Sequence, residues 1–195
     1  MKLSNDSRRD FIKKTLAGTA ALSLGGILPG FSAKSYGNIL GANDRIKVSM
    51  MGVNARGLAL AQNFASQPNC EVLYLADVDS RAIEKCSAAV EKVAGKAPKT
   101  SGDFRKTLED KDVDALVVAA PDHWHAPGTW LAVEGGKHVY VEKPCSHNPR
   151  EGELLVEYQK KYNKVIQMGN QQRSSNHSIE IINEIHKGII GKAYL

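Results

Sequence analysis

Cysteine and aromatic residues are scarce in this 195-residue sequence. The three cysteines, Cys70, Cys86 and Cys145, form neither a CxxC pair nor an even-numbered framework, which argues against a disulfide scaffold. Aromatic residues make up 6% of the chain and are not interleaved with a basic stripe, so base stacking with single-stranded nucleic acid is not indicated. The length suits one α/β domain plus a short additional segment.

Most of the sequence also lacks an excess of either charge. The formal net charge of +5 and the isoelectric point near 9.0 would suggest a nucleic-acid partner. However, six of the 26 basic residues and only two of the 21 acidic residues fall in residues 1–34, which leaves 20 basic and 19 acidic residues elsewhere. The main part of the chain is therefore nearly neutral, and we expect no nucleic-acid partner.

The basic N-terminal segment has the anatomy of an export signal. Arg8 and Arg9 stand together in the context S-R-R-x-F-I-K, which resembles a twin-arginine signal, and residues 15–33 carry no charge. This run approaches the ~20 residues that span a bilayer, but glycine, serine, threonine and proline dilute it. We expect residues 1–34 to direct export to the periplasm with no stable membrane span after processing. A membrane-anchored form is the alternative, and residues 35–44 are interpreted as a linker.

Strand and helix patterns alternate from Arg45 onward. Apolar runs predict strands at residues 46–51, 71–79, 112–121, 137–144 and 164–170. Helical spacing predicts helices at residues 58–65, 80–93, 103–110, 125–135, 149–162 and 178–186. This alternation indicates βαβ units and favours a doubly wound parallel sheet of the Rossmann type. Such sheets bind ligands beyond the carboxyl ends of their strands, so the residues that follow each strand are the candidates for a site.

The stretch VSMMGVNARGLALA, residues 48–61, follows the first of these strands. Gly52 and Gly57 occupy the first and third glycine positions of a dinucleotide-binding fingerprint, where they allow a tight turn and close packing of helix on strand. Asn54 replaces the middle glycine, and asparagine tolerates positive φ. These three residues and Arg56 are candidate cofactor contacts, although the pattern alone also fits an ordinary strand–helix turn.

An acidic residue, Asp77, follows the second predicted strand, 20 positions beyond Gly57. The fingerprint expects a carboxylate at about this distance to bind the ribose hydroxyls. A carboxylate would repel the 2′-phosphate of NADP, so NAD is the expected cofactor. NADP remains an alternative because Arg81 lies close enough in sequence to pair with a phosphate. A helix-capping role for Asp77 is the other interpretation, but Asp79 and Ser80 are better placed for it.

Two more motifs, PDHWHA and VEKP, follow later strands. In combination with G-x-x-x-x-G they resemble the glucose–fructose oxidoreductase/inositol dehydrogenase/MocA family. The resemblance runs from residue 45 to residue 195 and includes MGNQQR, similar to the strand that leads into the family's second domain. It implies an NAD(P)-binding domain at residues 45–170 and the start of a substrate domain at residues 171–195, with the rest of that domain missing. Asn54 is the departure from the family pattern.

The resemblance also implies site residues. Lys143, the lysine of EKP, would meet the substrate hydroxyl beside the nicotinamide as the catalytic residue, and Glu142 would lie near the nicotinamide riboside. Further cofactor contacts are expected from the loop that holds Pro121, His123, Trp124 and His125. A second proton-transfer group would come from the missing domain, whose sheet would also form a homo-oligomer.

The DHWH sequence permits a metal site as an alternative, because His123 and His125 lie two residues apart beside Asp122. No third strong ligand cluster is visible, so we expect no metal.

The resemblance leads to one main functional hypothesis and two alternatives. The main hypothesis is an NAD(P)-dependent oxidoreductase that acts on a sugar or cyclitol hydroxyl and is exported with its cofactor bound. The first alternative is an NAD-dependent carbohydrate hydrolase or epimerase that oxidises its substrate transiently. A non-enzymatic nucleotide-binding module is the third class. Net accumulation of NADH on addition of substrate would separate the first two.

Overall fold

A computed structural model describes residues 45–192 of the chain. The expected export signal and linker lie outside these residues. Within the described part of the chain, no helix is both long enough and apolar enough to cross a bilayer.

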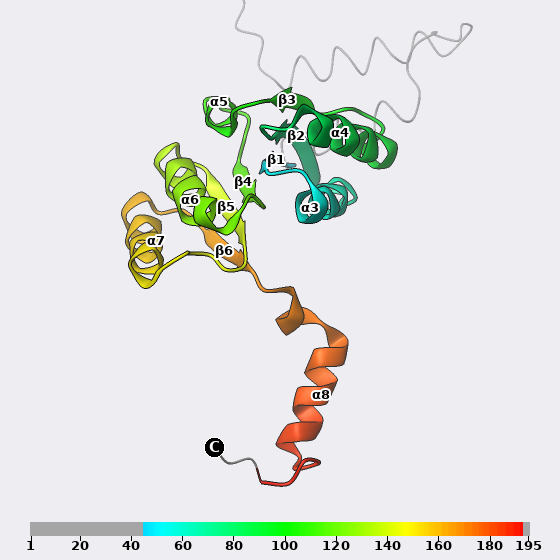
Figure 1. The fold of residues 1–195 in the computed structure, drawn as a ribbon, viewed down its shortest axis with the longest axis vertical. Helices are drawn as coiled ribbons and strands as arrows, with labels where there is room; N and C mark the ends of the chain where they lie inside the picture. Colours follow the sequence, from blue (N-terminus) through cyan, green and yellow to red (C-terminus); the bar gives the residue numbers. More distant parts are fainter. Residues whose placement is uncertain (1–44, 193–195) are drawn as a thin grey trace, which may run out of the picture. The chain divides into compact units, whose positions relative to one another are not determined.

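The described residues form a single six-stranded sheet in which all neighbouring strands are parallel (Figure 1). The strands are β1 (Ile46–Met51), β2 (Cys70–Ala76), β3 (Lys99–Ser101), β4 (Ala115–Val118), β5 (His138–Glu142) and β6 (Ile166–Gly169). Their order in the sheet is β3-β2-β1-β4-β5-β6, so the direction of winding reverses between β1 and β4. The predicted doubly wound parallel sheet is confirmed, and this reversal is the point where such sheets bind ligands.

Helices connect successive strands, and further helical segments follow β6. They are α3 (Ala55–Ala65), α4 (Ser80–Ala94), α5 (Phe104–Leu108), α6 (His125–Glu134), α7 (Pro149–Tyr162) and α8 (Asn176–His186), with short 3-10 helices η1 (Asp122–Trp124) and η2 (Gln171–Ser174). Asp79 caps α4 through a hydrogen bond from the Arg81 amide at 2.9 Å, as its position suggested. Asn148 caps α7, and its side chain accepts from the Glu151 amide.

Two apolar clusters pack on opposite faces of the sheet. One joins β1 and β2 to α3 and α4, and the other joins β4 and β5 to α5 and α6. Figure 1 shows the two sets of helices. Strand β4 serves both clusters, because Val117 points into the first while Leu116 and Val118 point into the second, each at most 1% exposed. This burial on both faces explains the continuous apolar run in its sequence.

The structure corrects several element boundaries. Strand β3 was not predicted, since Lys99–Ser101 is a short, polar edge strand with no apolar pattern. The predicted strand at residues 112–121 is only Ala115–Val118, because the apolar run continues into the turn after the last ladder pair. Helix α3 begins at Ala55, three residues earlier than predicted, because the residue before it supplies a cap that apolar spacing does not reveal.

The three cysteines are free thiols. Burial raises the pKa of Cys70 and of Cys86 to about 11 in each case. Both thiols therefore stay protonated near neutral pH, which fits structural rather than reactive roles.

Candidate functional site

Two pockets lie at the carboxyl ends of the central strands, and Ala120, just beyond β4, lines both. The Asp77 pocket has a volume of about 410 Å³. It is lined by Met51, Gly52, Ala76, Asp77, Val78, Gly102, Asp103, Phe104, Arg105, Ala120, Pro121, His123 and Trp124. The Lys143 pocket has a volume of about 420 Å³. It is lined by Arg56, Ala119, Ala120, Asp122, His125, Glu142, Lys143 and Gln171.

The turn between β1 and α3 is built around two glycines that have no room for a side chain. Gly52 has a φ of +82°, and a Cβ there would lie 2.7 Å from the backbone nitrogen of Ala120. A Cβ on Gly57 would lie 2.0 Å from the carbonyl oxygen of Gly52. Both positions therefore require glycine, as the fingerprint assigns them. The turn therefore brings three backbone segments, at Gly52, Gly57 and Ala120, into close approach.

Asn54 fills the middle position in a different way from the one expected. Its φ of −90° is ordinary, so positive φ is not the reason for asparagine here. Its side chain caps α3 and accepts a hydrogen bond from the Ala55 amide at 2.9 Å. The positive φ falls on Ala55, at 35°.

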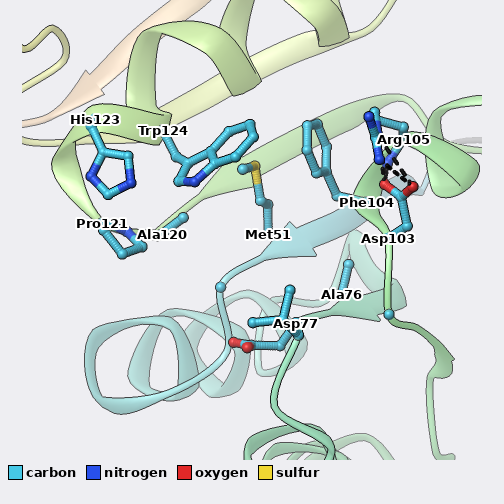
Figure 2. Close-up of a pocket in the computed structure, with 13 residues that line it drawn as sticks. Met51, Ala76, Asp77, Asp103, Phe104, Arg105, Ala120, Pro121, His123 and Trp124 are labelled. Atoms are coloured by element: carbon cyan, nitrogen blue, oxygen red, sulfur yellow. Dashed lines mark hydrogen bonds and ion pairs between the residues drawn. The ribbon is translucent and has the colours of Figure 1, made fainter.

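Asp77 faces the pocket named after it with its carboxylate fixed by two main-chain groups (Figure 2). One oxygen accepts from the Val53 amide at 2.8 Å and the other from the Asp79 amide at 3.0 Å. A carboxylate has about four acceptor positions, so these bonds orient the group and leave it able to accept ligand hydroxyls. The bond to Val53 also joins the end of β2 to the glycine turn.

Arg81, four residues after Asp77, and Arg105, which lines the same pocket, are both held by carboxylates of their own segments. Arg81 forms a two-point ion pair with Asp79, and Arg105 forms one with Asp103 (Figure 2). The guanidinium of Arg81 lowers the pKa of the Asp79 carboxyl, and Arg105 does the same for Asp103. The phosphate-binding role considered for Arg81 would first require this pair to break.

Phe104 and Trp124, which we call the aromatic wall, also line the Asp77 pocket. The Trp124 and Phe104 rings meet edge to face with centroids 6.3 Å apart, and Figure 2 shows Met51 between them. His123 lies beside Trp124, also at 6.3 Å between centroids. This slot can hold a flat ring against apolar side chains. Phe104 was not predicted, because its helix starts after the unrecognised strand β3.

Glu142 is the centre of the Lys143 pocket. Its side chain is only 6% exposed, and its Oε1 accepts from Arg56 Nε at 2.9 Å and from Gln171 Nε2. Lys143 follows it and is exposed at the pocket. The sequence assigned Arg56 to the cofactor, but the fold turns its Nε toward Glu142. Gln171 was not singled out, and the only sequence signal for it was its place in MGNQQR.

His125 is 2% exposed and touches two main-chain oxygens. Its Nδ1 lies against the carbonyl oxygen of Pro144, and its Nε2 lies 2.8 Å from that of Ala120. With a carbonyl oxygen against each nitrogen, the ring offers neither to a metal. His123 and His125 therefore cannot act as the pair of metal ligands that the alternative required. Among residues 45–192, no three His, Cys, Asp or Glu side chains gather as metal ligands would. The same contacts leave no free ring nitrogen for the direct cofactor contact expected of His125.

The sites predicted from sequence thus fall into groups. Gly52, Asp77, Pro121, His123 and Trp124 line the Asp77 pocket, and Arg56, His125, Glu142 and Lys143 line the Lys143 pocket. Asn54 and Gly57 shape the turn between them. A doubly wound sheet with a glycine turn after β1, a carboxylate after β2 and pockets across the switch point defines a dinucleotide-binding Rossmann domain.

Residues 46–170 match the profile of the oxidoreductase family with an NAD-binding Rossmann fold, the glucose–fructose oxidoreductase/inositol dehydrogenase/MocA family. The chain belongs to this family, which confirms the resemblance seen in its motifs. The turn at Gly52 and Gly57, which admits only glycine, agrees with the tight strand–helix turn that binds the pyrophosphate of such a cofactor.

Curated relatives that match this chain are longer than it. A glycosyl hydrolase family 109 protein from Saccharopolyspora erythraea is 28% identical over 95% of this chain and 44% of its own length. A glycosyl hydrolase family 109 protein 2 from Shewanella sp. strain ANA-3 is 25% identical over 97% of this chain and 45% of its own. The chain therefore spans less than half the length of these curated relatives.

Solved structures share the fold. Scyllo-inositol dehydrogenase from Lactobacillus casei, with bound NAD(H) and scyllo-inositol, has a TM-score of 0.65 and 22% identity over 76% of this chain and 43% of its own. At this identity the likeness shows the fold alone.

Proposed function

We propose that the full-length protein is an NAD(P)-dependent oxidoreductase that transfers a hydride between the nicotinamide and a sugar or cyclitol hydroxyl carbon. The observation that carries this proposal is the placement of Lys143 and Glu142 in a pocket that meets the Asp77 pocket at Ala120. A dinucleotide that crosses the switch point would reach both pockets. Membership of an oxidoreductase family supports the reaction class.

Each pocket has its own task in this proposal. Asp77 binds the adenosine ribose through carboxylate positions that the Val53 and Asp79 amides leave free. The aromatic wall holds the adenine. The nicotinamide, when bound, accepts the hydride, and Lys143 takes or relays the hydroxyl proton as the hydride leaves. Glu142 stays fixed between Arg56 and Gln171 beside the nicotinamide riboside.

NAD is the proposed cofactor, with NADP as the alternative. The Asp77 carboxylate would repel a 2′-phosphate. Arg81 and Arg105, the nearby groups that could neutralise such a phosphate, are paired with Asp79 and Asp103.

The proposal is tested by mixing the full-length protein and NAD with a panel of sugars and cyclitols, each in excess over the enzyme. The absorbance of reduced nicotinamide should rise with at least one of them. If no compound produced NADH and none was converted to any other product, the enzymatic proposal would be rejected in favour of a nucleotide-binding module.

A second candidate function is favoured by the two relatives named glycosyl hydrolase family 109. In this candidate, the substrate is oxidised, changed at a neighbouring position and reduced again on the same enzyme. Release of the leaving group from an aryl glycoside should then require NAD but leave no net NADH. Glycoside cleavage that persists after complete removal of NAD would contradict it.

The cellular location and assembly belong to the same proposal. Export by the twin-arginine route delivers the protein with its cofactor already bound, and the second domain supplies the remaining substrate contacts and the surface of a homo-oligomer.

A further inference from the structure

We propose that His125 is a positioning residue for Lys143, acting through the carbonyl of Pro144. This inference rests on the proposed function only for the role of Lys143. The His125 ring is 2% exposed and bridges two different loops, with Nδ1 at the carbonyl of Pro144 beyond β5 and Nε2 at the carbonyl of Ala120 beyond β4. The ring therefore lies between the two strand ends that border the Lys143 pocket, with one nitrogen against a carbonyl oxygen of each.

The backbone of Lys143 is held on both sides. The residue before it, Glu142, is anchored by Arg56 and Gln171. The residue after it, Pro144, has its carbonyl against His125. Lys143 itself is exposed. The two anchors would fix the lysine's Cα while leaving its amine free to meet a substrate, and a displacement of about 1 Å in such a group can lower turnover about 100-fold.

The main chain of His125 is held by its own helix. Thr129 is fully buried, and its Oγ1 donates to the His125 carbonyl at 2.7 Å. The first turn of α6 therefore fixes the main chain of His125, from which the imidazole extends toward both loops. A neutral imidazole has a single N–H, so its Nδ1–H tautomer donates to Pro144 and its Nε2–H tautomer to Ala120.

Two substitutions separate these contacts. The amide nitrogen of asparagine lies near the position of Nδ1, whereas that of glutamine lies near Nε2. His125→Asn should keep a donor for Pro144, and His125→Gln should keep one only for Ala120. If the Pro144 contact positions Lys143, the glutamine variant should lose about 10–100-fold in kcat with its NAD dissociation constant unchanged. The kcat of the asparagine variant should exceed that of the glutamine variant by about tenfold or more.

Cys145 gives a readout that does not depend on activity. It follows Pro144 and packs partly buried against the β4–β5 cluster. Loss of the Pro144 contact should speed its alkylation in the full-length protein by about tenfold, the scale of one hydrogen bond in a local opening. Peptide mass spectrometry resolves Cys145 from Cys70, an internal control whose labelling should not change.

The outcomes distinguish this inference from the proposed function. Faster Cys145 labelling in His125→Gln but not in His125→Asn supports positioning, and equal labelling in both variants overturns it. In a Lys143→Met background, His125→Gln should cause no further fall in kcat, because both changes act on one group. Normal turnover of Lys143→Met would reject the catalytic role of Lys143 while the labelling result still decides the role of His125.

A second variant covers the case in which the His125 variants do not fold. Thr129→Val removes the hydroxyl that bonds to the main-chain carbonyl of His125 and nearly preserves the side-chain shape. It should raise Cys145 labelling several-fold, and unchanged labelling would count against the inference. Ser49→Ala, which removes a buried hydrogen bond to Thr107 in another part of the sheet, serves as the control for general loss of stability.

Discussion

At the scale of single residues, the ion pairs of this domain differ in burial and therefore in how much each contributes to the free energy of unfolding. Arg56 is 45% exposed, but it pairs with Glu142, whose side chain is 6% exposed. The pair of Arg150 and Glu153 lies on the surface, with both side chains 65% exposed. Exposed pairs contribute little to stability, whereas a buried carboxylate that loses its partner is destabilising.

We predict that Arg56→Met lowers the free energy of unfolding by about 1–2 kcal/mol, a value reduced from the fully buried case because the arginine is half exposed. Arg150→Met should cause no measurable change. Urea unfolding of both variants at neutral pH checks this. Equal losses in the two variants would show that burial of Glu142 does not set the strength of the pair.

Asp77 carries the prediction on cofactor choice. Asp77→Ala should narrow the preference for NAD over NADP by about 1–3 kcal/mol, the scale for loss of a charged hydrogen bond. It should also lower the melting temperature, because the Val53 and Asp79 amides lose their acceptor. Titration of both cofactors gives the ratio, and Asp112→Ala, at the amino end of β4, is the control. Equal affinity of the unmodified protein for NAD and NADP would contradict the assignment.

The sequence indicated several of these residues but not their partners. Asp77 and Lys143 could be found because they directly follow apolar runs that predict strands. The bond of Arg56 to Glu142 joins residues 86 positions apart, and that of Gln171 to Glu142 joins residues 29 apart. Such pairings depend on the order of strands in the sheet, which local patterns do not contain.

At the scale of elements, the turn between β1 and α3 is the most constrained part of the site. Its glycines are set by backbone contact rather than by side-chain packing. A Cβ on Gly57 would strike the Gly52 carbonyl at 2.0 Å, and neither group can move without displacing the strand or the helix. By contrast, a Cβ on Gly152 in α7 would lie 3.3 Å from the flexible hydroxyl of Ser146.

We therefore predict that Gly57→Ala lowers the free energy of unfolding by about 1–3 kcal/mol and weakens NAD binding by about tenfold or more. Gly152→Ala should leave NAD binding unchanged. Thermal unfolding and cofactor titration of the two variants measure both effects. Normal NAD affinity in Gly57→Ala would mean that the turn does not contact the cofactor.

The limits of element prediction have a physical origin. A strand that is buried on both faces, such as β4, can be predicted from its continuous run of apolar residues. The edge strand β3 consists of Lys99, Thr100 and Ser101, a polar segment that pairs with β2 through the main chain and through the Lys99 side chain, which bonds to the Tyr74 hydroxyl at 3.2 Å. Its absence from the prediction also hid Phe104 and Arg105, which follow it into the Asp77 pocket.

At the scale of the whole molecule, the alternation of strands and helices was enough to predict the doubly wound sheet. The location of the site followed from the general rule that ligands bind at the carboxyl ends of the strands. What the alternation could not supply is the division of the site into two pockets that share Ala120, since that depends on the close approach of β4 to the glycine turn.

The N-terminal segment carries a prediction about the whole protein. Replacing both Arg8 and Arg9 by lysine keeps the charge but removes the twin-arginine feature. The precursor of this variant should accumulate in the cytoplasm, while the unmodified protein reaches the periplasm. Cell fractionation distinguishes the two, and normal export of the double variant would reject the interpretation of residues 1–34.

The central claim is that the cofactor binds across both pockets while Lys143 acts on the substrate. In the full-length enzyme, Lys143→Met should leave the NAD dissociation constant nearly unchanged and lower turnover by about 10²–10⁴-fold, the usual effect of a positioned acid–base group. Lys85→Met, an exposed change on α4, is the matched control and should alter neither quantity. Cofactor titration and turnover on the same preparation decide the matter. A fall in turnover of less than about tenfold would contradict the account and assign proton transfer to the second domain.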